Sequence, residues 1–163
     1  MAMVDVIFGT AKLASLLGTS ATLTTDLLVK AVSFTASNIY YLASSLASSP
    51  KIIGIKELEQ LEKELDLLET IKIYESWIVE LSQKKKELIE TSNTIKISIE
   101  SIHNSLEDLH QILKQIEARV ERHQKKWFSG WRSQDFTKEI NELKLKKKIL
   151  DNRFKILQQI KIE

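Results

Sequence analysis

The side chains best suited to chemistry at a surface gather in one stretch, HQKKWFSGWRSQD, which runs from His123 to Asp135. Tryptophan favours the headgroup level of a membrane, and lysine and arginine attract anionic lipid. The stretch therefore predicts an anchor at a membrane surface. The residues assigned to this anchor are Lys125, Lys126, Trp127, Phe128, Trp131 and Arg132.

The same stretch also allows a purely structural interpretation. Trp127 continues an apolar seam, and Trp131 is placed to cap the open end of a group of packed helices. Nucleic acid is not an expected partner. Base stacking uses aromatic side chains spaced along a groove, whereas these three aromatic residues share one turn.

A second group of cations follows in the sequence. Its members are Lys144, Lys146, Lys147 and Lys148, with Lys138, Arg153 and Lys155 nearby. Two interpretations apply to this group. It is either a contact with lipid or another polyanion, or a solvated helix face.

The sequence offers no recognisable catalytic or metal-binding motif. His103 and His110 lie one heptad apart and share a helix face, but no HExxH pattern accompanies them. The chain has no cysteine, its four glycines are scattered, and no Ser, His and Asp grouping has a nucleophile signature. We therefore expect a protein that is not an enzyme and that uses no metal or cofactor.

The elements that position these residues are expected to be helices. The 163 residues include one proline and four glycines, too few turn formers for a β-rich fold. From Leu67 onward apolar residues recur about every 3.5 residues, which places them on one buried seam. The seam consists of Leu67, Ile71, Tyr74, Ile78, Leu81, Lys85, Leu88, Ser92, Ile95, Ile99, Ile102, Leu106, Leu109, Leu113, Ile116, Val120, His123 and Trp127. Beside it, Ile73, Val79, Ile89, Ile97 and Ile112 are expected to widen the apolar face.

Helix boundaries follow from capping residues. Thr91, Ser92, Asn93 and Thr94 favour a break and hence a hairpin, although the unbroken seam also allows one continuous helix over 51–127. The last helix is expected to begin near Ser133 or Asp135, and to bury Phe136, Ile140, Leu143, Leu150, Phe154, Leu157 and Ile160. The predicted fold is all-α: residues 1–163 form a single domain, an antiparallel four-helix bundle with long helices. The helices are expected at 3–47 (with a break near 18–22), 51–90, 94–127 and 135–162.

The N-terminal segment differs in character from the rest of the chain. Residues 1–50 hold four charged side chains, whereas residues 91–163 hold fifteen Lys and Arg against ten Asp and Glu. Small residues recur there between larger apolar ones, which allows close helix approach in a core or in lipid. The larger apolar residues are Val4, Ile7, Phe8, Leu13, Leu16 and Leu17. Residues 31–49 are uncharged but rich in Ser, Thr, Asn and Tyr, which favours a soluble helix over a membrane span.

Three stretches resemble a known group of domains. VDVIFGTAKLASLLG at 4–18 and KIIGIKELEQLEKELDLLETI at 51–71 resemble the opening helices of HeLo and HeLo-like domains from fungal cell-death proteins. ERHQKKWFSGWRSQDFTKEINELKLKKKILDNRFKILQQI at 121–160 is similar to the end of the N-terminal four-helix bundle of mixed-lineage kinase domain-like pseudokinases. No kinase, nucleotide-binding or amyloid-forming segment occurs in these residues, which leaves the trigger open.

The resemblance implies a cell-death executioner domain. Such a domain would be cytoplasmic, would move to the plasma membrane on activation, and would oligomerise and permeabilise it through phosphoinositide contacts. A regulatory protein partner is expected to hold it inactive. Carried over, the turn residues are Lys125, Lys126, Trp127, Phe128 and Arg132, and the leading helix residues are Val4, Ile7 and Phe8. The alternative is a non-enzymatic adaptor or scaffold whose seam from Leu67 to Val120 is a docking surface.

Overall fold

A computed structural model describes residues 24–48, 66–124 and 135–160, and in these ranges every regular element is a helix. The predicted all-α class is therefore confirmed for the described part of the chain. The helices are α2 (Thr25–Ser48), α4 (Leu67–Lys84), α5 (Lys86–Thr91), α6 (Asn93–Gln124) and α7 (Thr137–Gln159).

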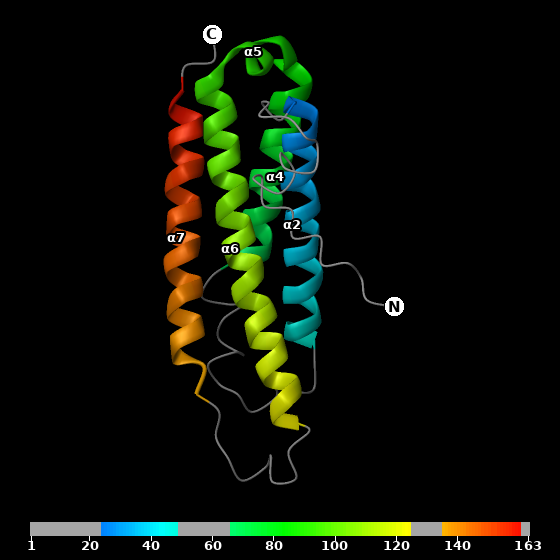
Figure 1. The fold of residues 1–163 in the computed structure, drawn as a ribbon, viewed down its shortest axis with the longest axis vertical. Coiled ribbons are helices and arrows are strands. Elements are labelled where there is room, and N and C mark those ends of the chain that lie inside the picture. Colours follow the sequence, from blue (N-terminus) through cyan, green and yellow to red (C-terminus); the bar gives the residue numbers. More distant parts are fainter. Residues whose placement is uncertain (1–23, 49–65, 125–134, 161–163) are drawn as a thin grey trace, which may run out of the picture.

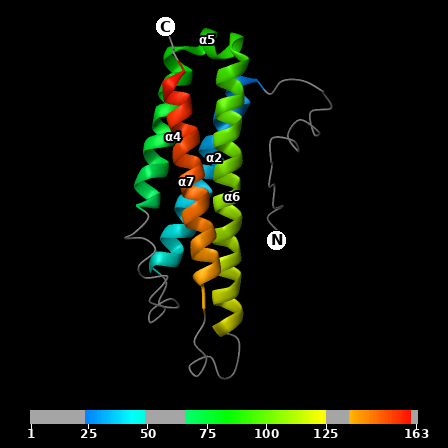
Figure 2. The same ribbon diagram turned by 90° about the vertical axis from the view of Figure 1, so that its left-hand side faces the viewer.

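The four longer helices lie side by side, and the short α5 crosses one end of them (Figure 1). From that end α2 and α6 run away, whereas α4 and α7 run toward it. Each long helix is therefore antiparallel to the long helix before it in the sequence. In the view turned by 90° about the vertical axis, α4 and α6 lie on opposite sides, with α7 in front and α2 behind (Figure 2). In both views α2 and α7 occupy opposite corners of the group.

Helix α6 is the central element, because it packs against both α2 and α7. Its predicted seam is confirmed from Ile95 to Val120, and each such buried Leu, Ile or Val side chain stabilises the fold by about 1.5–3 kcal/mol. The side chains of the predicted seam residues His123 and Trp127 lie outside the described residues. The buried seam residues of α6 are Ile95, Ile99, Ile102, Leu106, Leu109, Leu113, Ile116 and Val120. The predicted α7 residues are buried as well, from Phe136 to Leu157, and Ile160 packs against the core while partly exposed.

The turn between α4 and α6 contains two breaks, at Lys85 and at Ser92. A continuous helix is therefore excluded over 67–124, and the helix predicted over 51–90 is interrupted at Lys85. The reason is that Lys85 occupies a seam position, where an unbroken helix would bury its charge. Beyond the break Ile89, and not the predicted Leu88, is the fully buried residue. At the second break the Ser92 hydroxyl accepts the Ile95 N–H at 3.3 Å, the capping role expected of this stretch.

Two expectations about the seam and one helix start are corrected. Ile73 and Ile97 are exposed and do not widen the apolar face, because the width of a buried face is set by where the neighbouring helices lie. Helix α7 begins at Thr137, and the Asp135 carboxylate accepts the Thr137 N–H at 2.8 Å. Hydrogen bonds from Thr137 hold the pKa of the Asp135 carboxyl below its usual range.

The uncharged stretch 31–49 contributes to α2, which turns one face to the core. That face consists of Leu28, Val29, Val32, Ala36, Ile39 and Leu42. Among the helices in the described ranges, none combines the length and apolar character that crossing a membrane requires. The leading apolar residues Val4, Ile7, Phe8, Leu13, Leu16 and Leu17 lie outside the described residues.

Candidate functional site

The outward face of α7 is the described surface that best matches the predicted basic site. We define the α7 outer face as six exposed residues: Lys138, Lys144, Leu145, Lys148, Lys155 and Ile156. At 100° per residue these fall within an arc of about 120° and extend about 27 Å along the helix. Within α7, which the structure describes throughout, no acidic residue is exposed: Glu139 is buried, and Glu142 and Asp151 are half-buried. The exposed charged residues of α7 are therefore all positive.

The lysines of the predicted block point to different sides of the helix, because successive residues are about 100° apart around its axis. Lys146 forms an ion pair with Asp108 of α6, with 2.8 Å between Nζ and Oδ2. Lys147 pairs with Asp151 of its own helix, at 3.0 Å. Arg153 donates to the carbonyl of Ser101 and to the Ser105 hydroxyl, both at 2.7 Å. These three cations therefore form contacts within the fold. Lys144 and Lys148 have exposed side chains.

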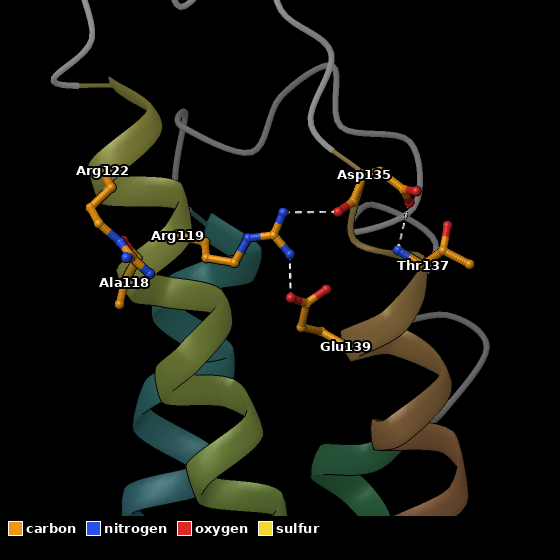
Figure 3. A network of polar contacts seen from close by, with 6 residues as sticks. All are labelled: Ala118, Arg119, Arg122, Asp135, Thr137 and Glu139. Atoms are coloured by element: carbon orange, nitrogen blue, oxygen red, sulfur yellow. Dashed lines mark hydrogen bonds and ion pairs between the residues drawn. The ribbon is translucent and has the colours of Figure 1, made fainter.

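The predicted basic and aromatic turn lies outside the described residues, but the helix ends beside it are described (Figure 3). Lys125, Lys126, Trp127, Phe128, Trp131 and Arg132 are thus not placed.

A polar network joins α6 to α7 next to that turn. The Arg119 guanidinium pairs with the buried carboxylate of Glu139, and it donates to the Asp135 carbonyl at 3.0 Å (Figure 3). Its carbon also lies 4.7 Å from the centre of the Phe136 ring. The network joins the start of α7 to the C-terminal part of α6.

Helix α4 contacts α7 through aromatic side chains. Tyr74 stacks on Phe154 with 3.9 Å between ring centroids, and Trp77 meets the same ring edge-on at 5.3 Å. The Tyr74 hydroxyl donates to the Asp151 carboxylate at 2.6 Å. Burial, reinforced by this hydrogen bond, raises the pKa of Tyr74 above its usual value. Asp151 thus links Tyr74 to Lys147 and orients the inner side of α7.

A buried polar cluster, missed in the sequence, joins α2 to α6. The Thr35 hydroxyl donates to Glu107 at 2.6 Å and lies 3.2 Å from Nε2 of the buried His103. Because the Thr35 proton goes to Glu107, we assign the His103 proton to Nε2, where it can donate to Thr35. His103 Nδ1 and Glu107 Oε2 are buried without a hydrogen-bond partner. The sequence feature that could have indicated a buried His103 was its position directly after the seam residue Ile102.

Burial lowers the pKa of His103 to about 4 and raises the pKa of Glu107. The unfolded chain binds the histidine proton near pH 6.5, so the contribution of His103 to stability is complete above that pH and is lost as the pH falls toward 4. The pH dependence of stability contributed by Glu107 has the opposite sign, since that contribution is lost as the pH rises through the raised folded pKa of Glu107.

We therefore expect His103→Leu to remove one component of the pH dependence of stability. Between pH 6.5 and 4 the unfolding free energy of the unmodified protein should fall by roughly 2 kcal/mol more than that of the variant. Denaturant titrations at several pH values measure this difference, in which the carboxylates common to both proteins largely cancel. His110→Leu, a half-buried histidine one heptad away, is the control. Parallel curves for the unmodified protein and His103→Leu would contradict the assignment.

Within residues 24–48, 66–124 and 135–160, no three His, Cys, Asp or Glu side chains are placed to hold a metal ion together.

Comparison with known proteins finds similarity to a viral protein. The chain is 30% identical over 93 residues to "Uncharacterized protein L717" of Acanthamoeba polyphaga mimivirus. The match covers 57% of this chain and 44% of that protein, so it spans less than half of the relative's length. No family model and no solved structure matches the chain. The fold and the sites described above therefore carry the functional argument.

Proposed function

We propose that this protein is a non-enzymatic, membrane-permeabilising helical domain that binds anionic, phosphoinositide-containing bilayers and oligomerises on them. It would act as a cell-death executioner, as the resemblance to HeLo-like domains implies, and would move from the cytoplasm to the plasma membrane. A protein partner would restrain it. The observation that carries the proposal is the α7 outer face, with four exposed lysines and no exposed acid within the helix.

The proposal includes a finer architecture. We propose that α2, α4, α6 and α7 are the members of one four-helix bundle in which α5 closes one end. The support is the chain order, in which successive long helices reverse direction, and the shared apolar core (Figure 1). The leading segment with Val4, Ile7 and Phe8 would insert after displacement, and the turn with Lys125 and Trp127 would join the headgroups.

The energetics favour a lipid surface. A lysine near an anionic membrane contributes about 1 kcal/mol, and the effect decays within a Debye length. The four lysines lie within an arc of about 120° and along about 27 Å of α7, so they occupy one side of the helix. Lys146 and Lys147 would contribute less to this contact, because their ammonium groups form ion pairs with Asp108 and Asp151.

Neutralising two lysines of the face tests the proposal. Lys148→Gln with Lys155→Gln should weaken binding to phosphoinositide-containing vesicles by about 2 kcal/mol, roughly thirty-fold. Co-sedimentation measures the binding, and dye release from the same vesicles measures permeabilisation.

The matched control is Lys30→Gln with Lys72→Gln, which removes the same charge from exposed positions on α2 and α4. If both double variants weaken vesicle binding equally, binding depends on net charge alone and the α7 outer face has no specific role in it. Absence of dye release from vesicles that bind the unmodified protein would contradict permeabilisation.

A second candidate function is an adaptor or scaffold. The docking surface expected for it, the seam from Leu67 to Val120, is buried within the chain itself. The observation that favours the adaptor is a different surface: exposed Phe34 and Tyr41 on α2, in a helix with no charged residue after Lys30. A stable protein complex that is insensitive to lipid composition, with no vesicle binding, would favour this alternative.

A further inference from the structure

Two aliphatic side chains stand among the lysines of the α7 outer face. Leu145 is 57% exposed and Ile156 is 56% exposed. They are separated by eleven positions. At 100° per residue their directions around the helix axis differ by about 20°, so both lie on nearly the same side of α7, about 16 Å apart along the axis. Single exposed aliphatic residues are common on protein surfaces. The feature to explain is their alignment within a strip of cations.

The neighbours of these two residues are suited to an interface between water and lipid. Lys144 and Lys148 flank Leu145, and Lys155 precedes Ile156. Lysine can bury its methylene stem against apolar groups while its ammonium reaches outward to headgroups. An amphipathic surface that binds in the plane of a membrane combines cations with aliphatic side chains in this way.

We propose that Leu145 and Ile156 insert between the lipids of an anionic bilayer, so that α7 lies parallel to the membrane plane. This inference rests on the proposed function and assigns its contact residues. The occupant is an anionic lipid surface, because the lysines supply charge complementarity and the two aliphatic side chains have no charge or hydrogen bond to offer an acidic protein. The spacing of the two insertion points fixes the orientation, since both can enter one flat surface when the helix axis is parallel to it.

The opposite corner of the molecule supplies an internal control. Helix α2 lies across the group from α7 in both views (Figures 1 and 2). Its Phe34 is 57% exposed, the same fraction as Leu145. In the proposed orientation α2 lies on the side of the group away from the membrane.

The absence of cysteine from the chain makes a direct test practical. Single variants Leu145→Cys, Ile156→Cys and Phe34→Cys are labelled with an environment-sensitive fluorophore in the full-length protein. The probe is a set of phosphatidylcholine vesicles with and without phosphoinositide. Labels at 145 and 156 should shift to shorter wavelength and brighten with the anionic vesicles, whereas the label at 34 should not. Leu145→Ser with Ile156→Ser should weaken binding about tenfold or more, and Phe34→Ser should leave it unchanged.

The outcomes separate the two proposals. If the unmodified protein binds anionic vesicles but all three labels respond alike, the insertion is wrong and the proposed function stands. If it does not bind them, both are wrong. If polyglutamate binds as tightly as vesicles and the labels at 145 and 156 stay unshifted, the face belongs to an acidic protein and the insertion is overturned. Circular dichroism confirms that each variant retains its helices.

Discussion

Phe154→Ala should lower the free energy of unfolding by about 4 kcal/mol. The Phe154 ring is buried between Tyr74, at 3.9 Å between centroids, and the edge of Trp77, at 5.3 Å. Removing it forfeits the transfer free energy of the ring and leaves a cavity that two aromatic neighbours cannot collapse to fill. The loss also separates α7 from α4, which these rings hold together. Denaturant unfolding followed by circular dichroism measures the change.

The matched control lies two residues further along α7. Ile156 is exposed, so Ile156→Ala should change the unfolding free energy by less than about 0.5 kcal/mol. The pair of variants shares helix, neighbourhood and type of truncation, and differs in burial. A loss below about 1 kcal/mol for Phe154→Ala would show that α4 and α7 are not packed through this ring.

The repeat of apolar residues in the sequence predicts which face of a helix is buried. Ile95, Ile99 and Ile102 recur at the spacing of a helix that faces partners, and all three are buried. The same repeat does not give the width of that face. Ile97 has the composition of a core residue but is exposed, because how far the buried arc extends depends on where neighbouring helices lie.

Breaks and buried polar contacts depend on partners distant in sequence. Lys85 fits the repeat in register, yet the helix ends there because of its charge. His103 follows a seam residue, and its environment is decided by Thr35, which lies on α2 and is 68 positions away. A single sequence without the packing arrangement cannot bring these two residues together.

In the candidate site too, the sequence predicts a basic helix, whereas the packing determines which of its side chains are exposed. Adjacency in sequence groups Lys146 and Lys147 with Lys148, but successive residues on a helix point about 100° apart. Lys146 therefore reaches Asp108 on α6, and Lys147 lies beside Asp151, whereas Lys148 faces outward. The sequence predicts a basic helix correctly, and the packing decides which of its cations remain available.

Arg119→Met should lower the free energy of unfolding by about 3 kcal/mol, because it leaves the buried Glu139 carboxylate without its partner. Among the described residues one Glu139 oxygen has no hydrogen-bond partner, and the Arg119 guanidinium donates to the other oxygen. The Asp135 carbonyl and the face of the Phe136 ring lose a contact in the same variant. Denaturant unfolding measures the loss.

A double-mutant cycle with Glu139→Gln separates the ion pair from these other contacts. If the pair dominates, Arg119→Met with Glu139→Gln should be more stable than the sum of the single changes predicts, since the double variant buries no unpaired charge. Additive losses would instead assign the effect to the Asp135 and Phe136 contacts. Because the network lies inside the junction of α6 and α7, the folded Arg119→Met variant should still bind anionic vesicles through Lys148 and Lys155. Loss of binding by that folded variant would place the membrane contact in the segment 125–134 instead.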